Sequence, residues 1–183
     1  MPPEAPVTRT RFPVNPVSIC GILSVMREQM TWEDLGTAVD DLAAQIRADG
    51  FNPDAVLALA RGGLPCAGAL AYALGVKSMA TLNVEFYTGV DERLDEPLLL
   101  PPVPDLTLLR AERLLVVDDV ADTGRTLALA SEFCAQHGPE VRTAVLYEKP
   151  QSVVRCDFVW RRTDRWINFP WSTPAPVGAT QAG

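Results

Sequence analysis

The amino-acid sequence predicts an α/β fold, in which a mostly parallel, twisted sheet is flanked by helices and carries a small hood or lid region. Runs of branched apolar residues alternate along the chain with segments of helical periodicity, which is the pattern of parallel sheets covered on both faces. The unusual polar sequences follow three expected strands, after Ala60, Asp119 and Tyr147. Because parallel strands end at one edge of their sheet, these loops should meet where such sheets bind ligands.

The first expected helix covers residues 31–50. Thr31 is a residue type that caps helix N-termini, and Glu33 and Asp34 place carboxylates in the first turn, where the helix dipole favours them. Gly50 is expected to end the helix. Four apolar residues repeat at helical spacing and mark the face that should be buried: Leu35, Val39, Leu42 and Ile46.

The next elements alternate between strand and helix. Residues 54–60 are apolar after Asp54 and predict a buried strand, and residues 61–63 predict a turn. Residues 64–74 predict a helix that ends at Gly75, and residues 78–84 predict a second strand. A strand, a crossover helix and a further strand make one unit of a parallel sheet.

Residues 85–112 interrupt this alternation. They are acidic, rich in proline and without a steady period, and a connection of this length inside a domain is usually a functional lid or a small subdomain. The alternation then resumes with expected strands at residues 113–118 and 141–147, separated by a helix at 126–136, and a last strand at 157–161. His137 is expected to cap the end of that helix.

The 183 residues suit a single domain, which we expect to cover residues 31–172. Residues 1–30 are rich in proline and lack clean periodicity, so they are expected to form a loose N-terminal extension, with Met26 and Met30 as candidate alternative starts. Residues 173–183 are expected to form a flexible tail.

Composition excludes several classes of protein. The net charge of −7 argues against a nucleic-acid or acidic-membrane binder, since such proteins display an excess of Lys and Arg. The longest apolar segment, residues 62–76, is too short to span a bilayer. The four cysteines and the single histidine show no metal-ligand spacing, which indicates reduced thiols in a cytoplasmic protein.

Residues 114–126 are the most informative segment. An apolar strand ends in two adjacent carboxylates, Asp118 and Asp119, and a short Asp-Thr-Gly-Arg-Thr loop then opens onto a helix. The loop amides and the positive end of the helix suit a phosphate, and Gly124 lets the backbone approach it closely. The two carboxylates remain available for ribose hydroxyls or for a divalent cation.

Two other loops carry groups for the rest of a phosphorylated sugar and a base. Arg61 and Gly62 follow a strand and open a helix, which predicts a second anion site suited to a pyrophosphate. Lys149 lies just past another strand and can donate to an exocyclic oxygen, while Trp166 can stack on a flat base. Neither the P-loop motif nor the dinucleotide glycine motif occurs.

These segments resemble the type I phosphoribosyltransferases, and within them the bacterial xanthine–guanine phosphoribosyltransferases. The resemblance runs from Thr31 to Trp171, about three quarters of the chain. It depends on four blocks: Leu59–Leu64, Val117–Thr126, Glu148–Pro150 and Trp166–Trp171.

The resemblance implies a phosphoribosyltransferase that acts in purine salvage. Its substrates would be phosphoribosyl pyrophosphate and a 6-oxopurine (guanine, xanthine or hypoxanthine), with Mg2+ as cofactor, pyrophosphate as leaving group and a homodimer or homotetramer as assembly. Asp122 would exchange a proton with the purine N7, Asp118 and Asp119 would hold the ribose, and Asp119 would also hold the metal. The peptide bond between Ala60 and Arg61 would be cis.

The resemblance also implies the residues that bind each part of the ligands. The 5′-phosphate would be held by the helix-opening loop: Thr123, Gly124, Arg125 and Thr126. The pyrophosphate would be held by Arg61 and Gly62. The base would be held by Lys149 at its 6-oxo group, by stacking on Trp166, and by the carbonyl of Ile167 at its 2-position.

Two departures from the family leave the preferred base open. Residues 85–110 are long and acidic, and Glu148 adds a negative charge beside Lys149, which we expect to lie near the base pocket. One alternative keeps the fold and changes the acceptor to hypoxanthine alone or to a pyrimidine. Another is a regulator that senses phosphoribosyl pyrophosphate, although the acidic balance of the chain counts against a nucleic-acid partner.

Overall fold

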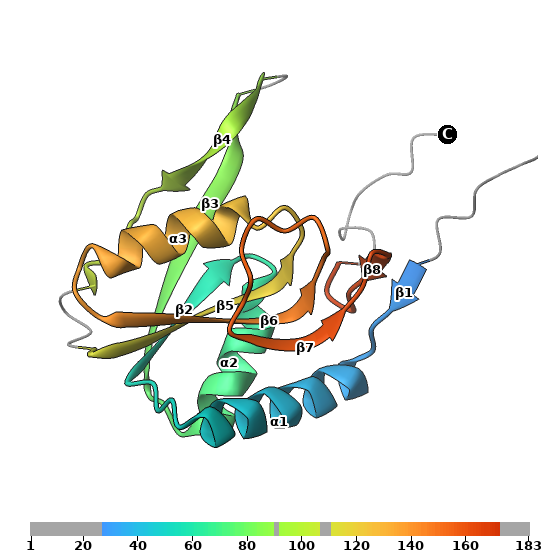
Figure 1. Ribbon diagram of the computed structural model, residues 1–183. Coiled ribbons are helices and arrows are strands. Elements are labelled where there is room, and N and C mark those ends of the chain that lie inside the picture. The colour runs from blue at the N-terminus through green and yellow to red at the C-terminus, as the bar shows by residue number, and fades with distance from the viewer. Residues whose placement is uncertain (1–26, 90–91, 107–110, 173–183) are drawn as a thin grey trace, which may run out of the picture.

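A computed structural model (Figure 1) describes residues 27–89, 92–106 and 111–172, and gives only the backbone for residues 86–89 and 92–98. Its centre is a six-stranded sheet in the order β4-β3-β2-β5-β6-β7, in which all neighbours are parallel except β3 and β4. The strands are β2 (Ala55–Ala60), β3 (Ser78–Gly89), β4 (Glu92–Leu100), β5 (Arg113–Ala121), β6 (Glu140–Glu148) and β7 (Phe158–Arg162).

Three helices cover the sheet. Helices α1 (Trp32–Asp49) and α2 (Gly63–Leu74) lie on one face, and α3 (Arg125–Ala135) lies on the other (Figure 1). The predicted α/β architecture, a mostly parallel sheet between helices, is therefore confirmed. In the described part of the chain, no helix combines the length and the apolar character needed to cross a bilayer.

Two apolar cores lie on opposite faces of the sheet, because side chains alternate along each strand. Val56 of β2 and Leu115 of β5 belong to the core under α1 and α2. Their neighbours Leu57 and Val116 belong to the core under α3. Burial on both faces explains why these strands are continuous apolar runs in the sequence.

Helix α1 begins and ends where the sequence predicted. Thr31 and Asp34 form a capping box, in which the Thr31 hydroxyl accepts a hydrogen bond from Asp34 N at 3.1 Å and the Asp34 carboxylate accepts one from Thr31 N at 2.9 Å. Gly50 closes the helix with a left-handed φ of 83°. At the end of α3, His137 Nδ1 lies 2.8 Å from the carbonyl oxygen of Phe133, so the predicted capping role of this histidine is confirmed.

Residues 85–112, which were expected to form a lid, contain the end of β3 and all of β4, and these two strands form a β-hairpin. Strand β3 continues to Gly89, five residues past the predicted end at residue 84, and returns antiparallel as β4. The hairpin rises beyond the rest of the sheet (Figure 1). The sequence predicted no strand here, because an acidic, proline-rich segment lacks the apolar alternation by which strands are recognised.

A second, two-stranded sheet pairs β1 (Arg27–Gln29) with β8 (Trp166–Asn168) in parallel. Residues 27–30 were expected in a loose extension, and this expectation was wrong: residues 27–29 form β1, and Met30 is buried in the core. Their strand depends on a partner almost 140 positions away, so nothing in the local sequence predicts it. The remaining residues of the expected extension, 1–26, and those of the expected tail, 173–183, lie outside the described residues.

The order of the strands reverses direction between β2 and β5. The chain passes from β2 through α2 to β3 on one side, and from β5 through α3 to β6 on the other. Ligands of open parallel sheets bind outside the carboxyl ends of the strands at such a switch point. The loops that leave β2 and β5 are those with Arg61 and with Asp122.

Candidate active site

Two adjacent carboxylates stand at the end of β5. Strand β5 extends to Ala121, so Asp118 and Asp119 lie within its last four residues and not in the loop that follows. Asp119 N donates a hydrogen bond of 2.9 Å to Asp118 Oδ1. The pKa of Asp118 is raised well above its ordinary value, mainly by burial and secondly by repulsion from Asp119.

The pKa of Asp119 is also raised by burial, although hydrogen bonds from the Trp171 side chain and from backbone amides work in the opposite direction. Two carboxylates held together in this way repel each other when both are ionised. A bound cation or a pair of hydroxyl donors would relieve that repulsion. The end of β5 is therefore suited to a metal ion or a diol.

The loop after β2 packs directly against these carboxylates. A Cβ at Gly62 would collide with the Asp119 carboxylate, and a Cβ at Gly63 would lie 2.6 Å from the Val117 carbonyl oxygen. Glycine is therefore required at both positions for the two loops to approach. The Ala60–Arg61 peptide bond is cis, as the resemblance predicted.

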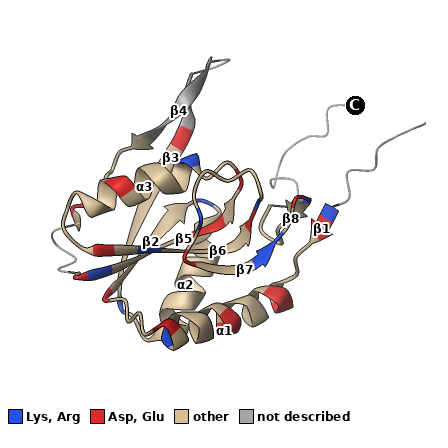
Figure 2. Cartoon of the chain, viewed as in Figure 1, with Lys and Arg blue, Asp and Glu red and all other residues tan. Residues whose placement is uncertain are grey.

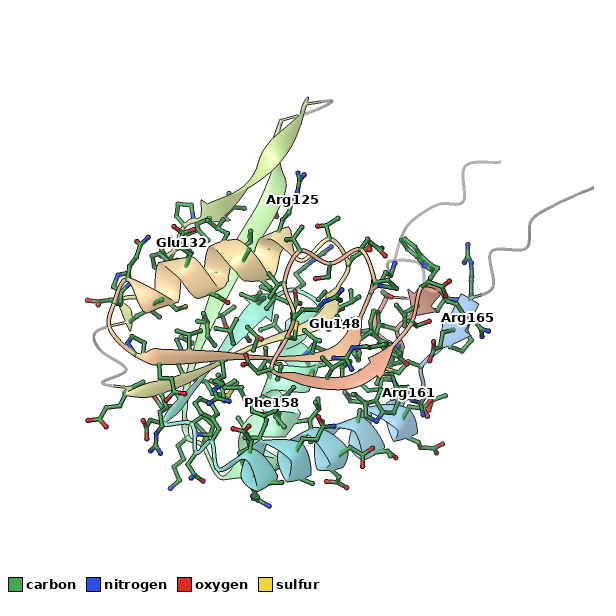
Figure 3. All side chains as sticks on the ribbon, in the orientation of Figure 1. Arg125, Glu132, Glu148, Phe158, Arg161 and Arg165 are labelled. Carbon is green, nitrogen blue, oxygen red and sulfur yellow. The ribbon has the colours of Figure 1, made fainter. Side chains whose placement is uncertain are left out.

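The loop between β5 and α3 has the form of a phosphate site. Gly124 is the N-cap residue of α3, with a φ of 75°, and offers no side chain to cap the helix. Arg125 N donates a long hydrogen bond of 3.5 Å to Thr123 Oγ1, and the helix dipole favours an anion at this end. Figure 3 shows the Arg125 side chain at this end of α3, directed away from the sheet, so only its backbone belongs to the predicted site.

This loop is joined to the loop after β6 by backbone hydrogen bonds. Lys149 N donates to the Ala121 carbonyl oxygen at 3.0 Å, and Val153 N donates to the Thr123 carbonyl oxygen at 2.9 Å. A Cβ at Gly124 would collide with the Ser152 hydroxyl. The two loops therefore form one packed unit, which carries both the phosphate-site residues and Lys149.

A pocket of about 470 Å³ opens beside this unit. Its walls come from β1, β5, β8 and the loops that follow β5, β6 and β8. The lining residues are Arg27, Val120, Asp122, Lys149, Trp166, Ile167, Asn168, Phe169 and Ser172.

Asp122 and Lys149 form an ion pair inside the pocket. Lys149 Nζ lies 3.3 Å from Asp122 Oδ2, and the Lys149 side chain is only 9% exposed. Gln151 Nε2 donates to the other oxygen, Oδ1, at 2.6 Å. The Lys149 ammonium also lies 5.5 Å from the centroid of the Trp166 ring, so the predicted base-binding residues do come together.

Strand β8 presents its residues alternately to the pocket and to the core. Trp166 is 56% exposed, whereas the Ile167 side chain is only 6% exposed and packs in the apolar core. Only the backbone of Ile167 can therefore reach a ligand. This arrangement agrees with the predicted role of its carbonyl.

Glu148 does not act as the sequence analysis expected. Its carboxylate is 1% exposed and accepts hydrogen bonds from Cys156 N at 2.8 Å, Arg162 Nε at 3.0 Å and Arg155 at 3.3 Å. Burial favours the neutral acid, but these three donors outweigh it and lower the pKa of Glu148. Glu148 does not line the pocket that holds Lys149 and Trp166, so its charge is neutralised outside that pocket.

Several residues of the pocket carry no motif in the sequence. Arg27 lies in the segment expected to form a loose extension, and Gln151 follows the Lys-Pro pair without a motif of its own. Val120 was overlooked between the acid pair and Asp122, although the alternation of β5 could have placed it beside Asp122. Ser172 belongs to no motif that predicts a ligand.

The acid pair fits a metal ion that is shared with a substrate. Among the described residues, no three His, Cys, Asp or Glu side chains cluster closely enough to hold a metal by themselves. Mg2+ is usually held by one or two carboxylates together with substrate phosphates and water. Asp118 and Asp119 supply such a partial set, and their raised pKa values indicate a site that gains from added positive charge.

Known proteins share this fold and sequence. The xanthine-guanine phosphoribosyltransferase of Ruegeria sp. (strain TM1040) is 31% identical over 153 residues, which cover 78% of this chain and 83% of that protein. The protein of the same name from Idiomarina loihiensis is 32% identical over 146 residues, with 78% and 84% covered. The solved structure of a purine phosphoribosyltransferase from Pyrococcus horikoshii superposes with a TM-score of 0.69 and 33% identity, over 84% of this chain and 99% of that one.

Residues 31–177 match the family described as the phosphoribosyl transferase domain, which is most of the chain. The matched segment contains the acid pair, both anion loops, Lys149 and Trp166. The chain therefore belongs to the phosphoribosyl transferase domain family.

Proposed function

We propose that this protein transfers the 5-phosphoribosyl group of phosphoribosyl pyrophosphate to a 6-oxopurine in purine salvage and releases pyrophosphate. The observation that carries this proposal is the Asp122–Lys149 pair, with 3.3 Å between Oδ2 and Nζ, in a pocket bounded by Trp166. A 6-oxopurine presents N7 and O6 side by side on one edge. A carboxylate beside N7–H and an ammonium beside O6 complement that edge.

The same pair disfavours other bases. Adenine would place its 6-amino donor against the Lys149 ammonium, which has only donors. A pyrimidine has no imidazole nitrogen to face Asp122. The names of the curated relatives, xanthine-guanine phosphoribosyltransferases, and of the Pyrococcus structure, a purine phosphoribosyltransferase, support the same choice of acceptor.

The sugar donor would lie across the switch point between β2 and β5. Residues 123–126 would bind its 5′-phosphate at the start of α3. Arg61 and Gly62 would bind the pyrophosphate, because Gly62 brings this loop against Asp119. Asp118 and Asp119 would accept hydrogen bonds from the two ribose hydroxyls that lie between these ends.

Asp119, with Asp118 beside it, would hold Mg2+ together with oxygens of the donor. The metal supplies positive charge that stabilises the pyrophosphate as it leaves. The two aspartates in turn hold the ribose beside the pyrophosphate loop, against which Asp119 packs. Their negative charge stabilises the positive charge that develops on the ribose ring.

The chemical step exchanges one bond at the anomeric carbon for another. The bond from C1′ to the pyrophosphate oxygen breaks, and its electron pair leaves with pyrophosphate. A bond forms from C1′ to the purine N9, and Asp122 accepts the proton that N7 gives up. Lys149 beside O6 and the Trp166 ring hold the base in the plane in which N9 faces C1′.

The β3–β4 hairpin would serve as the hood of the site. Strand β3 is parallel to β2, so its extension past residue 84 rises at the carboxyl edge of the sheet, where the ligand loops lie. A cover at this edge would exclude water, which would otherwise hydrolyse the donor.

A second copy of the chain would pack on α2. This helix carries no charged residue (Figure 2), and its Leu64 and Tyr72 are exposed, as is Met79 of β3, which lines the same pocket as Tyr72. Exposed apolar side chains gathered in this way are typical of an interface between proteins. A homodimer or homotetramer in solution, measured by light scattering and reduced to a smaller species in Y72D, would support this assembly.

A panel of bases tests the proposed reaction. The protein is incubated with phosphoribosyl pyrophosphate, MgCl2 and either guanine, xanthine, hypoxanthine, adenine, uracil or orotate, and the nucleotide product is measured. Turnover is expected with the three 6-oxopurines alone. Turnover only with a pyrimidine would refute the acceptor, and calorimetric binding of the donor without turnover of any base would favour a sensor.

A further inference from the structure

The pocket contains one cation for which the proposed reaction has no use. Arg27 lines it from β1, opposite Trp166 in the register of the small sheet. Paired residues of neighbouring strands project on the same face, so Arg27 stands on the face from which Trp166 would stack on the base. The adjacent pair, Glu28 and Ile167, belongs to the other face, where Glu28 lies 3.7 Å from Arg161 and Ile167 is buried.

Arg27 leaves the pocket with an uncompensated positive charge. Three charged side chains line the pocket, and two of them, Asp122 and Lys149, neutralise each other at 3.3 Å. Within the described part of the chain, the Arg27 guanidinium makes neither a hydrogen bond nor an ion pair. A ligand that brings negative charge to this side of the pocket would neutralise the Arg27 guanidinium.

The position of β1 indicates which edge of a base would meet Arg27. Asp122 and Lys149 follow strands of the large sheet, whereas β1 pairs with β8 in the separate small sheet (Figure 1). A base whose N7 and O6 face Asp122 and Lys149 turns its opposite edge, with C2, toward β8 and β1. The 6-oxopurines differ from one another only at C2.

The chemistry at C2 separates the three bases. Guanine has an amino donor there, hypoxanthine has a hydrogen, and xanthine has an oxo group and ionises near neutral pH. A guanidinium has five donors and no acceptor, so it complements an oxo group or an anionic edge and opposes an amino group. The Ile167 carbonyl only accepts and therefore suits the amino group of guanine, whereas the Asn168 side chain can both donate and accept. Arg27 is therefore the lining residue at this edge that favours an oxo group.

We propose that Arg27 is a specificity-determining residue that raises the preference for xanthine over guanine, by pairing with the oxo group at C2. This inference extends the proposed function and depends on it. It assigns a role in substrate choice to the first described strand of the chain, which lies before the residues matched by the family.

The test compares kcat/KM for xanthine and for guanine within each variant. In R27Q the ratio of the two values is expected to fall about tenfold, the scale of one specific contact to a substrate group. R27K keeps the charge but loses the planar guanidinium, so its xanthine-to-guanine ratio should lie between those of R27Q and the wild type. R165Q is the matched control: Arg165 is a nearby exposed arginine that does not line the pocket (Figure 3), so its ratio should not change.

Measuring both bases in the same variant separates specificity from a loss of folded protein, since misfolding lowers both values equally. A xanthine-to-guanine ratio that is the same in R27Q and the wild type would overturn the inference. Wild-type protein that turns over none of the three 6-oxopurines would instead overturn the proposed function, and the role of Arg27 with it.

Discussion

Gln151 Nε2 lies 2.6 Å from Asp122 Oδ1, while Lys149 Nζ lies 3.3 Å from the other oxygen of the same carboxylate. The group that we propose to accept the purine proton is therefore held from two sides. Because the amide of Gln151 donates and carries no charge, it fixes the plane of the carboxylate without neutralising it. This contact makes Gln151 a positioning residue for Asp122.

Replacing Gln151 should lower turnover without removing the binding of the base. In Q151L, kcat with guanine is expected to fall about tenfold, because the carboxylate of Asp122 loses one hydrogen bond that orients it. Q151E should reduce kcat further, since it places a like charge beside Asp122. Steady-state kcat and KM for the three proteins provide the measurement, and an unchanged kcat in Q151L would contradict the positioning role.

Replacing Asp122 itself should have a larger effect. D122N keeps the shape of the side chain but removes its capacity to accept a proton, so kcat is expected to fall by about 10²–10⁴-fold. Binding of the sugar donor, measured by calorimetry, should remain within about threefold of the wild type, because in the proposed complex Asp122 contacts the base and not the donor. Near wild-type turnover in D122N would remove Asp122 from the proposed mechanism.

The acid pair predicts an unusual dependence of stability on pH. The pKa values of Asp118 and Asp119 are raised in the folded protein, so between about pH 4 and those raised values the folded state binds more protons than the unfolded chain. Their contribution to the free energy of unfolding is therefore largest below about pH 4 and is lost as the pH rises through the folded pKa values.

D118N should remove this loss of stability at higher pH, because asparagine cannot ionise. At pH 8, without ligands, the Tm of D118N is expected to exceed that of the wild type by about 2–4 °C, and the difference should shrink toward pH 4, where the wild-type pair keeps a proton. Thermal unfolding monitored by circular dichroism between pH 4 and 8 measures this difference. A D118N protein that is less stable than the wild type at pH 8 would show that the pair stabilises the fold when ionised.

A methyl group at Gly62 should disturb the contact between the two ligand loops. A Cβ there would collide with the Asp119 carboxylate, so G62A is expected to lower the free energy of unfolding by about 1–3 kcal/mol and to weaken donor binding at least tenfold. Gly68 offers a matched control on α2, since a Cβ at that position meets nothing within 4 Å. G68A should be neutral or stabilising by up to about 1 kcal/mol, and equal effects in both variants would exclude the proposed collision.

Much of the fold could be predicted because local patterns determined it. The capping box of Thr31 and Asp34 fixed the start of α1, and the continuous apolar runs of β2 and β5 required burial on both faces. The prediction that the polar loops meet at one sheet edge followed from parallel strands. The three described cysteines are free and buried, as expected for reduced thiols, and Cys20 lies outside the described residues.

The parts that could not be predicted depend on contacts between distant residues. Arg27 enters the pocket only because β1 pairs with β8. Glu148 was expected near the base because it adjoins Lys149, but neighbours on a strand project to opposite faces, and arginines from the following loop and β7 neutralise it. The hairpin strand β4 lies at the edge of the sheet and pairs only with β3 among the described strands, and such a strand need not show the continuous apolar run of a central strand.

The backbone hydrogen bonds from Lys149 to Ala121 and from Val153 to Thr123 have a consequence for how the two substrates meet. In the proposed complex, the residues that bind the sugar phosphate and those that bind the base belong to two loops that these hydrogen bonds join. The hydrogen-bonded backbone would therefore align the reacting carbon and nitrogen before any hood closes. In such an arrangement, little of the binding energy is needed to align the two reacting atoms.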